Sequence, residues 1–248
     1  MFSIVYLESI DGRLEIEEQA VKDELERLGN TNITIASRKK LLQYISQKKY
    51  SNVFVAGSIQ LVRPSLKILK CKLPPPNDYP LCLKEYFHRN IWKSNIKTLR
   101  SHFYDSATEI FAKPYDRKKS FTGRVFRSSE DLIYLNGVGN NTKIYCSPVV
   151  NWVSECRFYI KKGHIIGKSH YDGDKDKLVD MNVIHTAIQI YEDSGEAVST
   201  YIMDFGVLDN DNTALVEVND AYSVGLYDGM DPQLYADLII TRWVELTS

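Results

Sequence analysis

Two short apolar runs, YIMDFGVLD and TALVEVND, carry two acids and an amide suited to chemistry: Asp204, Glu217 and Asn219. Both runs alternate in polarity and are rich in β-branched and aromatic residues, and a polar turn at residues 209–212 separates them. This pattern predicts a β-hairpin. If the middle two residues of the turn form its centre, Asp204 lies directly opposite Glu217.

Such opposed acids need a compensating charge. Directly opposed residues have Cβ atoms ~5 Å apart, and at an effective dielectric of about 20 two carboxylates so placed repel by roughly 3 kcal/mol. A hard cation would offset this repulsion. Asn219, two residues after Glu217, projects from the same face and adds a neutral oxygen. This oxygen set predicts Mg²⁺ or Mn²⁺ bound jointly with phosphates.

A strand lysine and the basic loop after it could supply the counter-charge for phosphates. Lys113 ends the apolar segment FAKPY on the same face as Phe111. The following DRKKSFTGRVF combines cations, among them Lys119, with hydroxyls and a glycine, so it could close over a polyphosphate. The alternatives are a lysine that snorkels from a strand end and a solvated charge run.

Arg157 is the second isolated cation within an apolar strand. Alternation in SECRFYI places Glu155, Arg157 and Tyr159 on one face. An arginine beside a metal site suits bidentate contact with phosphate. The alternative is a structural ion pair with Glu155 or another acid.

The segment HYDGDKDKLVD resembles a calcium loop only in its first half. Lys177 stands where the glycine is needed, and Val183 where a bidentate glutamate is needed, which argues against calcium binding. We expect a polar loop that meets substrate instead, with Lys168, His170 and Tyr171 at its base.

The first 70 residues alternate between strand and helix patterns, which favours a parallel sheet. The predicted strands are 2–8, 32–37 and 52–58, and the predicted helices are 14–29, 38–48 and 60–70. The turns lack the Gly-x-Gly-x-x-Gly motif that cradles a dinucleotide. This unit is therefore expected to be a scaffold.

The proline-rich segment LPPPNDYP, residues 73–80, predicts an extended linker. A helix over 81–99 is expected after it, followed by a mostly β region. The predicted strands there are 109–115, 120–126, 143–150, 154–163 and 164–173, with helices at 181–193 and 231–247.

Composition excludes several classes of protein. The chain has 248 residues, 44% of them hydrophobic, and 31 Lys and Arg against 32 Asp and Glu, which argues against binding nucleic acid through bulk charge. There is no apolar run of 18 residues and no signal-peptide pattern, so we expect a cytoplasmic protein without membrane association. The four cysteines lack Cys-x-x-Cys spacing and are expected to be reduced.

Together these pieces resemble the ATP-grasp superfamily, in which a strand lysine, a basic loop, a segment like SPVV and an acid followed thirteen residues later by Glu-x-Asn occur in this order. KPYDRKKSFTGRVF, SECRFYI, SHYDGDKDK and VEVNDAYSVGLY are more similar to a divergent bacterial and phage clade. That clade is related to the eukaryotic cell-division-cycle 123 protein, an assembly factor for a translation initiation complex. The resemblance covers roughly residues 80–248.

The resemblance implies an α+β ATP-grasp fold, in which two α+β subdomains clasp a nucleotide, preceded by a small Rossmann-like α/β domain. We expect the N-terminal domain at 1–76 and the ATP-grasp domain at 77–248. By similarity Lys113 would contact the α/β-phosphates, Lys119 would cover the nucleotide and Arg157 would reach the phosphates. The adenine hinge would be Ser147, Pro148, Val149 and Val150, and the Mg²⁺ ligands would be Asp204, Glu217 and Asn219.

Two departures from the family pattern stand out. Many small-peptide ligases of the superfamily carry an arginine where this chain has Ile202, which leaves Arg157 as the substitute. The usual earlier lysine has three candidates, Arg89, Lys93 and Lys97.

Three functions fit these residues. The first is an ATP-dependent carboxylate–amine ligase that acts through an acyl phosphate, on substrates that include a peptide or protein, with Lys113 and Arg157 as catalytic residues. The second is an ATP–Mg-binding assembly or modification factor with little turnover. A metal-dependent nuclease fits less well, since no lysine follows the second acid at the activating position. The acceptor pocket is expected between loops 168–177 and 220–230, with Asp220, Tyr222 and Ser223 near its floor.

Overall fold

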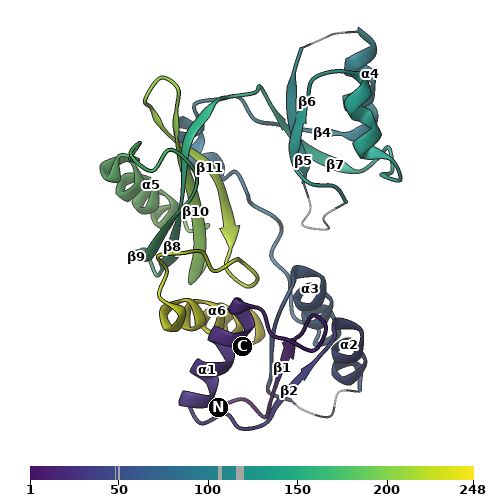
Figure 1. The fold of residues 1–248 in the computed structure, drawn as a ribbon, viewed down its shortest axis with the longest axis vertical. Coiled ribbons are helices and arrows are strands. Elements are labelled where there is room, and N and C mark those ends of the chain that lie inside the picture. Colours follow the sequence, from purple (N-terminus) through teal and green to yellow (C-terminus); the bar gives the residue numbers. More distant parts are fainter. Residues whose placement is uncertain (48, 50, 106–107, 116–119) are drawn as a thin grey trace.

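The alternating pattern of the first 70 residues folds as the sequence predicts. A computed structural model of the chain describes residues 1–47, 49, 51–105, 108–115 and 120–248. Three strands form a parallel sheet in the order β2-β1-β3, flanked by helices (Figure 1). The strands are β1 (Ile4–Glu8), β2 (Ile33–Ala36) and β3 (Val53–Ala56), and the helices are α1 (Ile16–Arg27), α2 (Arg38–Ser46) and α3 (Ile59–Ile68).

The carboxyl ends of these parallel strands lie on one edge of the sheet, and a glycine brings two of them close together. Gly57, directly after β3, has φ +153°, and a Cβ built there would lie 2.6 Å from the Cβ of Glu8 at the end of β1. A larger residue at position 57 would therefore push the two strand ends apart.

The segment 81–99 does not form the single helix that its apolar pattern predicts. It contains a 3-10 helix, η1 (Leu81–Phe87), then strand β4 (Trp92–Asn95) and then helix α4 (Ile96–Asp105). His88 has φ +49° and ends η1. Pairing with a distant strand gives β4 backbone hydrogen bonds that a helix would otherwise supply.

A second sheet, antiparallel, has the order β4-β7-β5-β6. Its remaining strands are β5 (Ile110–Pro114), β6 (Arg124–Phe126) and β7 (Lys143–Ser147). Helix α4 and a 3-10 helix not predicted from sequence, η2 (Ser129–Leu135), share a hydrophobic core with this sheet.

The third sheet is also antiparallel, in the order β11-β10-β8-β9, and α5 covers one of its faces (Figure 1). Apolar side chains of alternate positions, such as Phe158 and Met203, pack with α5 in one core. The intervening positions face the other way and carry the polar residues discussed below. The elements are β8 (Trp152–Lys161), β9 (His164–Gly173), α5 (Met181–Asp193), β10 (Thr200–Leu208) and β11 (Thr213–Asp220).

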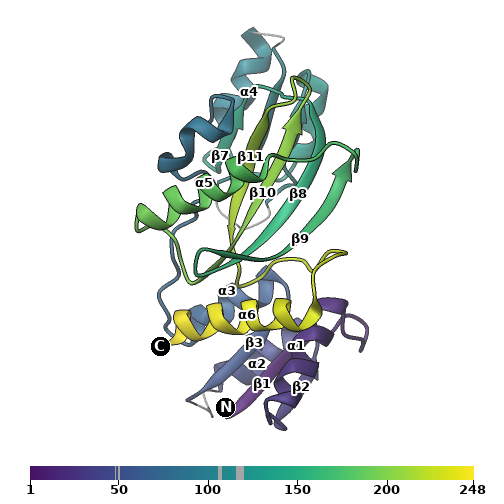
Figure 2. The same ribbon diagram turned by 90° about the vertical axis from the view of Figure 1, so that its left-hand side faces the viewer.

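The C-terminal helix α6 (Pro232–Thr247) joins the N-terminal unit to the third sheet (Figure 2). It begins as predicted, with the Asp231 side chain accepting hydrogen bonds from two amides of the first turn. Trp243 packs among the strands of the N-terminal sheet and donates a hydrogen bond of 2.7 Å to the Val53 carbonyl oxygen. No helix in the described ranges is long and apolar enough to cross a membrane.

Candidate functional site

Asp204 and Glu217 lie directly opposite each other on β10 and β11, as the sequence predicts. The turn between them differs from the predicted one, because Val207 pairs with Thr213, one residue short of the predicted register. A bulge at Val216 then restores the register before the two acids meet. The acids are therefore paired as predicted by two compensating irregularities.

The pairing continues sideways across the whole third sheet. Glu217, Asp204, Arg157 and Ser169 occupy directly opposed positions on β11, β10, β8 and β9. We call these four residues the charged row. Within it Asp204 has an acid on one side and a cation on the other, so its position is electrostatically frustrated on the β11 side and satisfied on the β8 side.

Arg157 holds Asp204 in a bidentate ion pair. Its Nε and Nη2 donate to the two carboxylate oxygens at 2.9 and 2.8 Å, and the two side chains are only 11% and 3% exposed. Burial raises the pKa of Asp204 against the lowering effect of Arg157. Burial acts to lower the pKa of Arg157, but the hydrogen bonds and charge of Asp204 raise it. The alternative predicted for Arg157, a pair with an acid, is thus what the structure shows.

Two stacked tyrosines cover the Arg157 guanidinium. Its central carbon lies 4.8 Å from the Tyr227 ring centroid and 5.8 Å from that of Tyr171, and the two rings stack at 5.6 Å. Tyr171 donates a hydrogen bond of 2.7 Å to Glu155. Burial raises the pKa of Tyr171, so its hydroxyl stays protonated and fixes the ring against the arginine.

Lys113, at the end of β5, reaches the charged row from the second sheet. Its Nζ pairs with Glu217 and, at 2.7 Å, with Asp78, and it lies 4.7 Å from the Tyr79 ring centroid. Burial acts to lower the pKa of Lys113, but the charge of Glu217, with Asp78, raises it well above its ordinary value. Sequence reasoning missed Asp78 and Tyr79, which follow the prolines of the linker.

The three predicted metal ligands share one place on the sheet face. Asn219 donates a hydrogen bond of 2.6 Å to Glu217. Burial acts to raise the pKa of Glu217, but the charge of Lys113 and the hydrogen bonds from Lys113 and Asn219 lower it to about 2. The carboxylate is therefore ionised at neutral pH.

The donor set fits a metal bound together with phosphates. Among the described residues no three His, Cys, Asp or Glu side chains are grouped so that they alone could hold a metal ion. Mg²⁺, however, commonly takes one or two carboxylates and completes its shell with water and phosphate oxygens. Asp204 and Glu217, with the amide oxygen of Asn219, supply such a partial set.

The three candidates for the earlier phosphate cation lie in different surroundings. Arg89 donates hydrogen bonds to the carbonyl oxygens of Leu215 and Val216, so it supports the β11 backbone at the bulge. Lys93 is exposed and lies 4.7 Å from the Tyr115 ring centroid. Lys97 is exposed in the first turn of α4. Lys93 and Lys97 are thus more accessible than Arg89.

The predicted adenine hinge connects the second and third sheets. It runs from Ser147, the last residue of β7, to Val150, two residues before β8 begins. Ser147 is buried and its hydroxyl donates to the Pro148 carbonyl oxygen at 2.9 Å. Val149 is 38% exposed, and the predicted hinge residues are Ser147, Pro148, Val149 and Val150.

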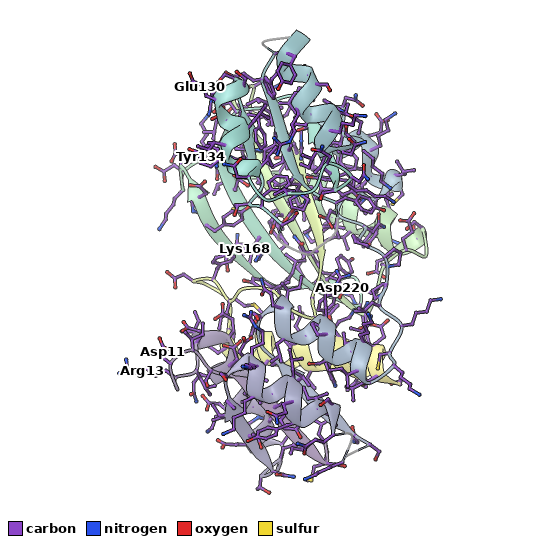
Figure 3. The ribbon with its side chains drawn as sticks, turned by 90° about the vertical axis from the view of Figure 1, so that its right-hand side faces the viewer. Asp11, Arg13, Glu130, Tyr134, Lys168 and Asp220 are labelled. Atoms are coloured by element: carbon purple, nitrogen blue, oxygen red, sulfur yellow. The ribbon has the colours of Figure 1, made fainter. Side chains whose placement is uncertain are left out.

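The predicted substrate residues separate into two groups. Lys168, His170 and Tyr171 lie on β9, and Lys168 is exposed where the third sheet approaches the N-terminal unit (Figure 3). The buried Nε2 of His170 has no hydrogen-bond partner among the described residues. Only Tyr171 contacts the charged row, through Arg157.

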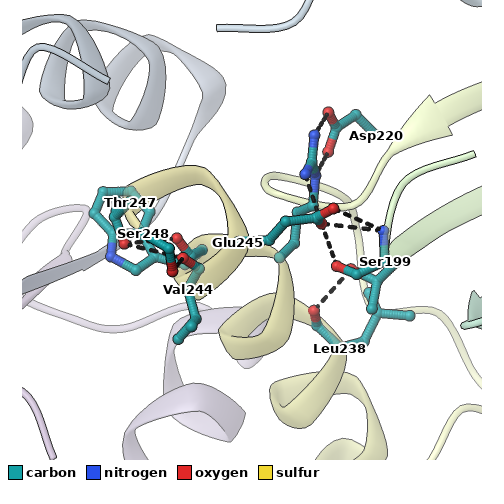
Figure 4. A network of polar contacts seen from close by, with 10 residues as sticks. Ser199, Asp220, Leu238, Val244, Glu245, Thr247 and Ser248 are labelled. Atoms are coloured by element: carbon teal, nitrogen blue, oxygen red, sulfur yellow. Dashed lines mark hydrogen bonds and ion pairs between the residues drawn. The ribbon is translucent and has the colours of Figure 1, made fainter. Parts of the chain in front are cut away.

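The other group follows β11. Asp220 accepts two hydrogen bonds of 2.7 Å from Arg242, which also holds Glu245 (Figure 4), so the carboxylate of Asp220 ties β11 to α6. Ser223 donates a hydrogen bond of 3.0 Å to the Gly57 carbonyl oxygen. Tyr222 is buried. Lys119, the predicted cover of the nucleotide, lies outside the described residues.

A cleft of about 1100 Å³ opens between the N-terminal unit and the two antiparallel sheets. Lys113, Glu217 and Asn219 line one side of it, and the carboxyl ends of β1, β2 and β3 line the other. Tyr222 and Ser223 also line this cleft, whereas Asp220 faces a separate cavity of about 430 Å³. The charged row therefore borders a space large enough for a substrate.

A protein-family model described as an ATP-grasp domain, the second family of its clade, matches residues 86–238. No curated protein matches the chain significantly.

Three ligases of known structure share the fold. The D-alanine–D-alanine ligase from Bacillus anthracis complexed with ATP has a TM-score of 0.55 at 12% identity, over 100% of this chain and 97% of that one. N5-carboxyaminoimidazole synthetase from Staphylococcus aureus complexed with ADP has 0.54 at 11%, over 97% and 78%. The ATP-grasp ligase PsnB complexed with a minimal precursor has 0.53 at 12%, over 98% and 100%, and a PsnB complex with a precursor variant, Mg and ADP has 0.50 at 11%, over 98% and 97%. At these identities the likeness shows the fold alone, an α+β ATP-grasp fold, as predicted.

Proposed function

We propose that this chain, which belongs to the ATP-grasp domain family, is an ATP-dependent carboxylate–amine ligase that works through an acyl phosphate. The observation that carries the proposal is the arrangement of two cations and two opposed acids: Arg157 holds Asp204, and Lys113 holds Glu217. These are the charges that a metal–nucleotide complex needs, already gathered at one border of the cleft.

Nucleotide binding would exchange the partners of these four groups. Lys113 would turn to the α/β-phosphates and Arg157 to the phosphates, which leaves Asp204, Glu217 and the Asn219 oxygen to hold Mg²⁺ or Mn²⁺. The metal would supply neutralisation of phosphoryl charge. Complexes of structural relatives with ATP, and with Mg and ADP, support this assignment.

The adenine would lie against the backbone of the hinge, Ser147 to Val150. This segment joins the two sheets that carry Lys113 and Arg157, so a base bound there would have its phosphates within reach of both. Lys119 would cover the nucleotide from the basic loop.

The reaction then needs no covalent bond to the protein. An oxygen of the substrate carboxylate attacks the γ-phosphorus of ATP, the bond from that phosphorus to the bridging oxygen breaks, and ADP leaves. The amine nitrogen attacks the acyl carbon, inorganic phosphate leaves with the former carboxylate oxygen, and the nitrogen releases a proton. Lys113 and Arg157 would orient the phosphates and neutralise charge that develops on them.

The test is to incubate the protein with Mg-ATP and pooled cell extract and to search for a new mass that forms with ADP and phosphate. We expect one ADP and one phosphate per new amide bond, and a large loss of rate in Asp204→Asn. Unchanged product formation by Asp204→Asn would exclude the proposal. Tight Mg-ATP binding without turnover would instead support the assembly-factor function.

A further inference from the structure

The wall of the cleft that faces the charged row is acidic. It includes Glu8 at the end of β1 and Glu17 and Glu18 in the first turn of α1, and Ser58 follows β3 beside them. In open sheets with parallel strands, ligands bind outside the carboxyl ends of the strands where the strand order reverses. In the order β2-β1-β3 that point lies between β1 and β3, where Glu8 and Ser58 stand.

Two of the three glutamates are anchored by one oxygen each. Glu8 accepts a hydrogen bond of 2.7 Å from the Ser58 amide, and Glu17 accepts one of 3.1 Å from the Leu226 amide. The second oxygen of each carboxylate accepts no hydrogen bond from any described residue. The close approach of Gly57 to Glu8 holds this arrangement together.

Glu18 has no such anchor. Its side chain lines the cleft, and the residue is only 9% exposed, yet no other described residue forms a hydrogen bond or an ion pair with its carboxylate. Burial, with the charges of Glu17 and Glu8, raises the pKa of Glu18 to about 7. First-turn acids often stabilise a helix by facing its N-terminal dipole, and Glu17 and exposed Glu15 can do so without burial. Helix stabilisation therefore does not explain a buried carboxylate at position 18.

No cation of the described chain compensates these acids. Lys113 is held by Asp78 and Glu217. Arg38 and Lys39 line the cleft, but both are exposed and neither forms an ion pair with the glutamates. The Ser58 hydroxyl, whose oxygen is shielded from solvent, also lacks a partner among the described residues. The wall thus presents several acceptors and one hydroxyl to the cleft without an internal donor.

We propose that Glu8, Glu17, Glu18 and Ser58 bind a protonated primary amine of the substrate, a group that this site recognises and that does not itself react. An ammonium group carries three N–H donors, which matches the three carboxylates. This inference rests on the proposed function, since it assigns a substrate to the same cleft. The amine belongs either to a lysine side chain of a peptide or to an α-amino group.

Ligand-observed NMR without nucleotide tests this binding independently of ATP use. The probes are acetyl-Gly-Lys-Gly-amide and Gly-Gly-Gly-amide, each with a counterpart in which the amine is acetylated. The variant Glu18→Gln removes the charge with little change of shape, and Glu26→Gln is a matched control on the exposed side of α1. A second variant, Glu8→Gln, tests the site through another strand, and circular dichroism verifies folding.

We expect at least one free-amine probe to bind the wild type and Glu26→Gln, and to bind Glu18→Gln and Glu8→Gln at least tenfold more weakly. Acetylation should weaken binding by at least tenfold. The probe that binds identifies the lysine or α-amine source. Absence of binding by both free amines, or equal binding of acetylated probes or of both glutamine variants, would overturn the inference. Mg-ATP binding, measured separately, shows whether the proposed function itself fails.

Discussion

Arg157 donates two hydrogen bonds to Asp204 from the directly opposed position on the neighbouring strand. The pair gives a buried acid a partner in the absence of a metal. It also stores a guanidinium beside the position where phosphate is proposed to bind. One interaction therefore serves the stability of the sheet and the readiness of the site.

Removing Asp204 should destabilise the protein, since the largely shielded Arg157 would lose its partner. We expect Asp204→Ala to lower the free energy of unfolding by about 3–5 kcal/mol, measured by urea denaturation. The double variant Arg157→Met/Asp204→Leu, which removes both charges, should recover most of this loss. An effect of Asp204→Ala below about 1 kcal/mol would show that the pair contributes little.

Replacing Lys113 should weaken nucleotide binding. Lys113→Met removes the cation assigned to the α/β-phosphates and leaves Glu217 and Asp78 without their shared ammonium. We expect at least a tenfold rise in the Kd for Mg-AMPPNP, measured by calorimetry. Lys84→Met, at an exposed position of η1, is the control. Equal affinity of both variants would contradict the role of Lys113.

Glu217 should make the protein sensitive to acid. Its pKa of about 2 lies below the ordinary value of 4.5, so its stabilising contribution is present above pH 4.5 and is lost as the pH falls toward 2. Between pH 6 and pH 2.5 the wild type should lose stability relative to Glu217→Gln, by at most about 3 kcal/mol. Exposed Glu130→Gln is the control. Parallel pH profiles for wild type and Glu217→Gln would refute this shift.

Glu18 should have the opposite effect. Its pKa is raised from 4.5 to about 7, so the folded state binds more protons than the unfolded state, and stability falls as the pH rises from 4.5 to 7. Glu18→Gln should therefore be more stable than the wild type at pH 8, by at most about 3 kcal/mol, and similar to it at pH 4. Denaturation at both pH values measures the difference, and a variant less stable at pH 8 would contradict it.

The sequence predicts local patterns of this protein better than its long-range partners. Alternation placed Arg157, Asp204 and Glu217 on a common side of their strands, and the hairpin pairing is confirmed. The turn itself was predicted wrongly, since a bulge at Val216 cannot be seen in polarity alternation. Strand pairing also overrode the apolar pattern that predicted a helix over 81–99.

The partners of the cations could be predicted only in part. Asp78 lies in a proline-rich segment without periodicity, and its contact with Lys113 depends on how that segment crosses the sheets. The acids of the cleft wall were hidden for a different reason. Glu17 and Glu18 match an ordinary first helical turn, and only burial distinguishes Glu18 from such residues.

The most direct test of the central claim is the metal dependence of nucleotide binding. Calorimetric titration of AMPPNP into the wild type should show tight binding with Mg²⁺ and at least tenfold weaker binding in EDTA, and Asp204→Asn should lose most of this difference. Equal affinity of the wild type with and without Mg²⁺, or full metal dependence in Asp204→Asn, would contradict the assignment of the two opposed acids to a metal–nucleotide site.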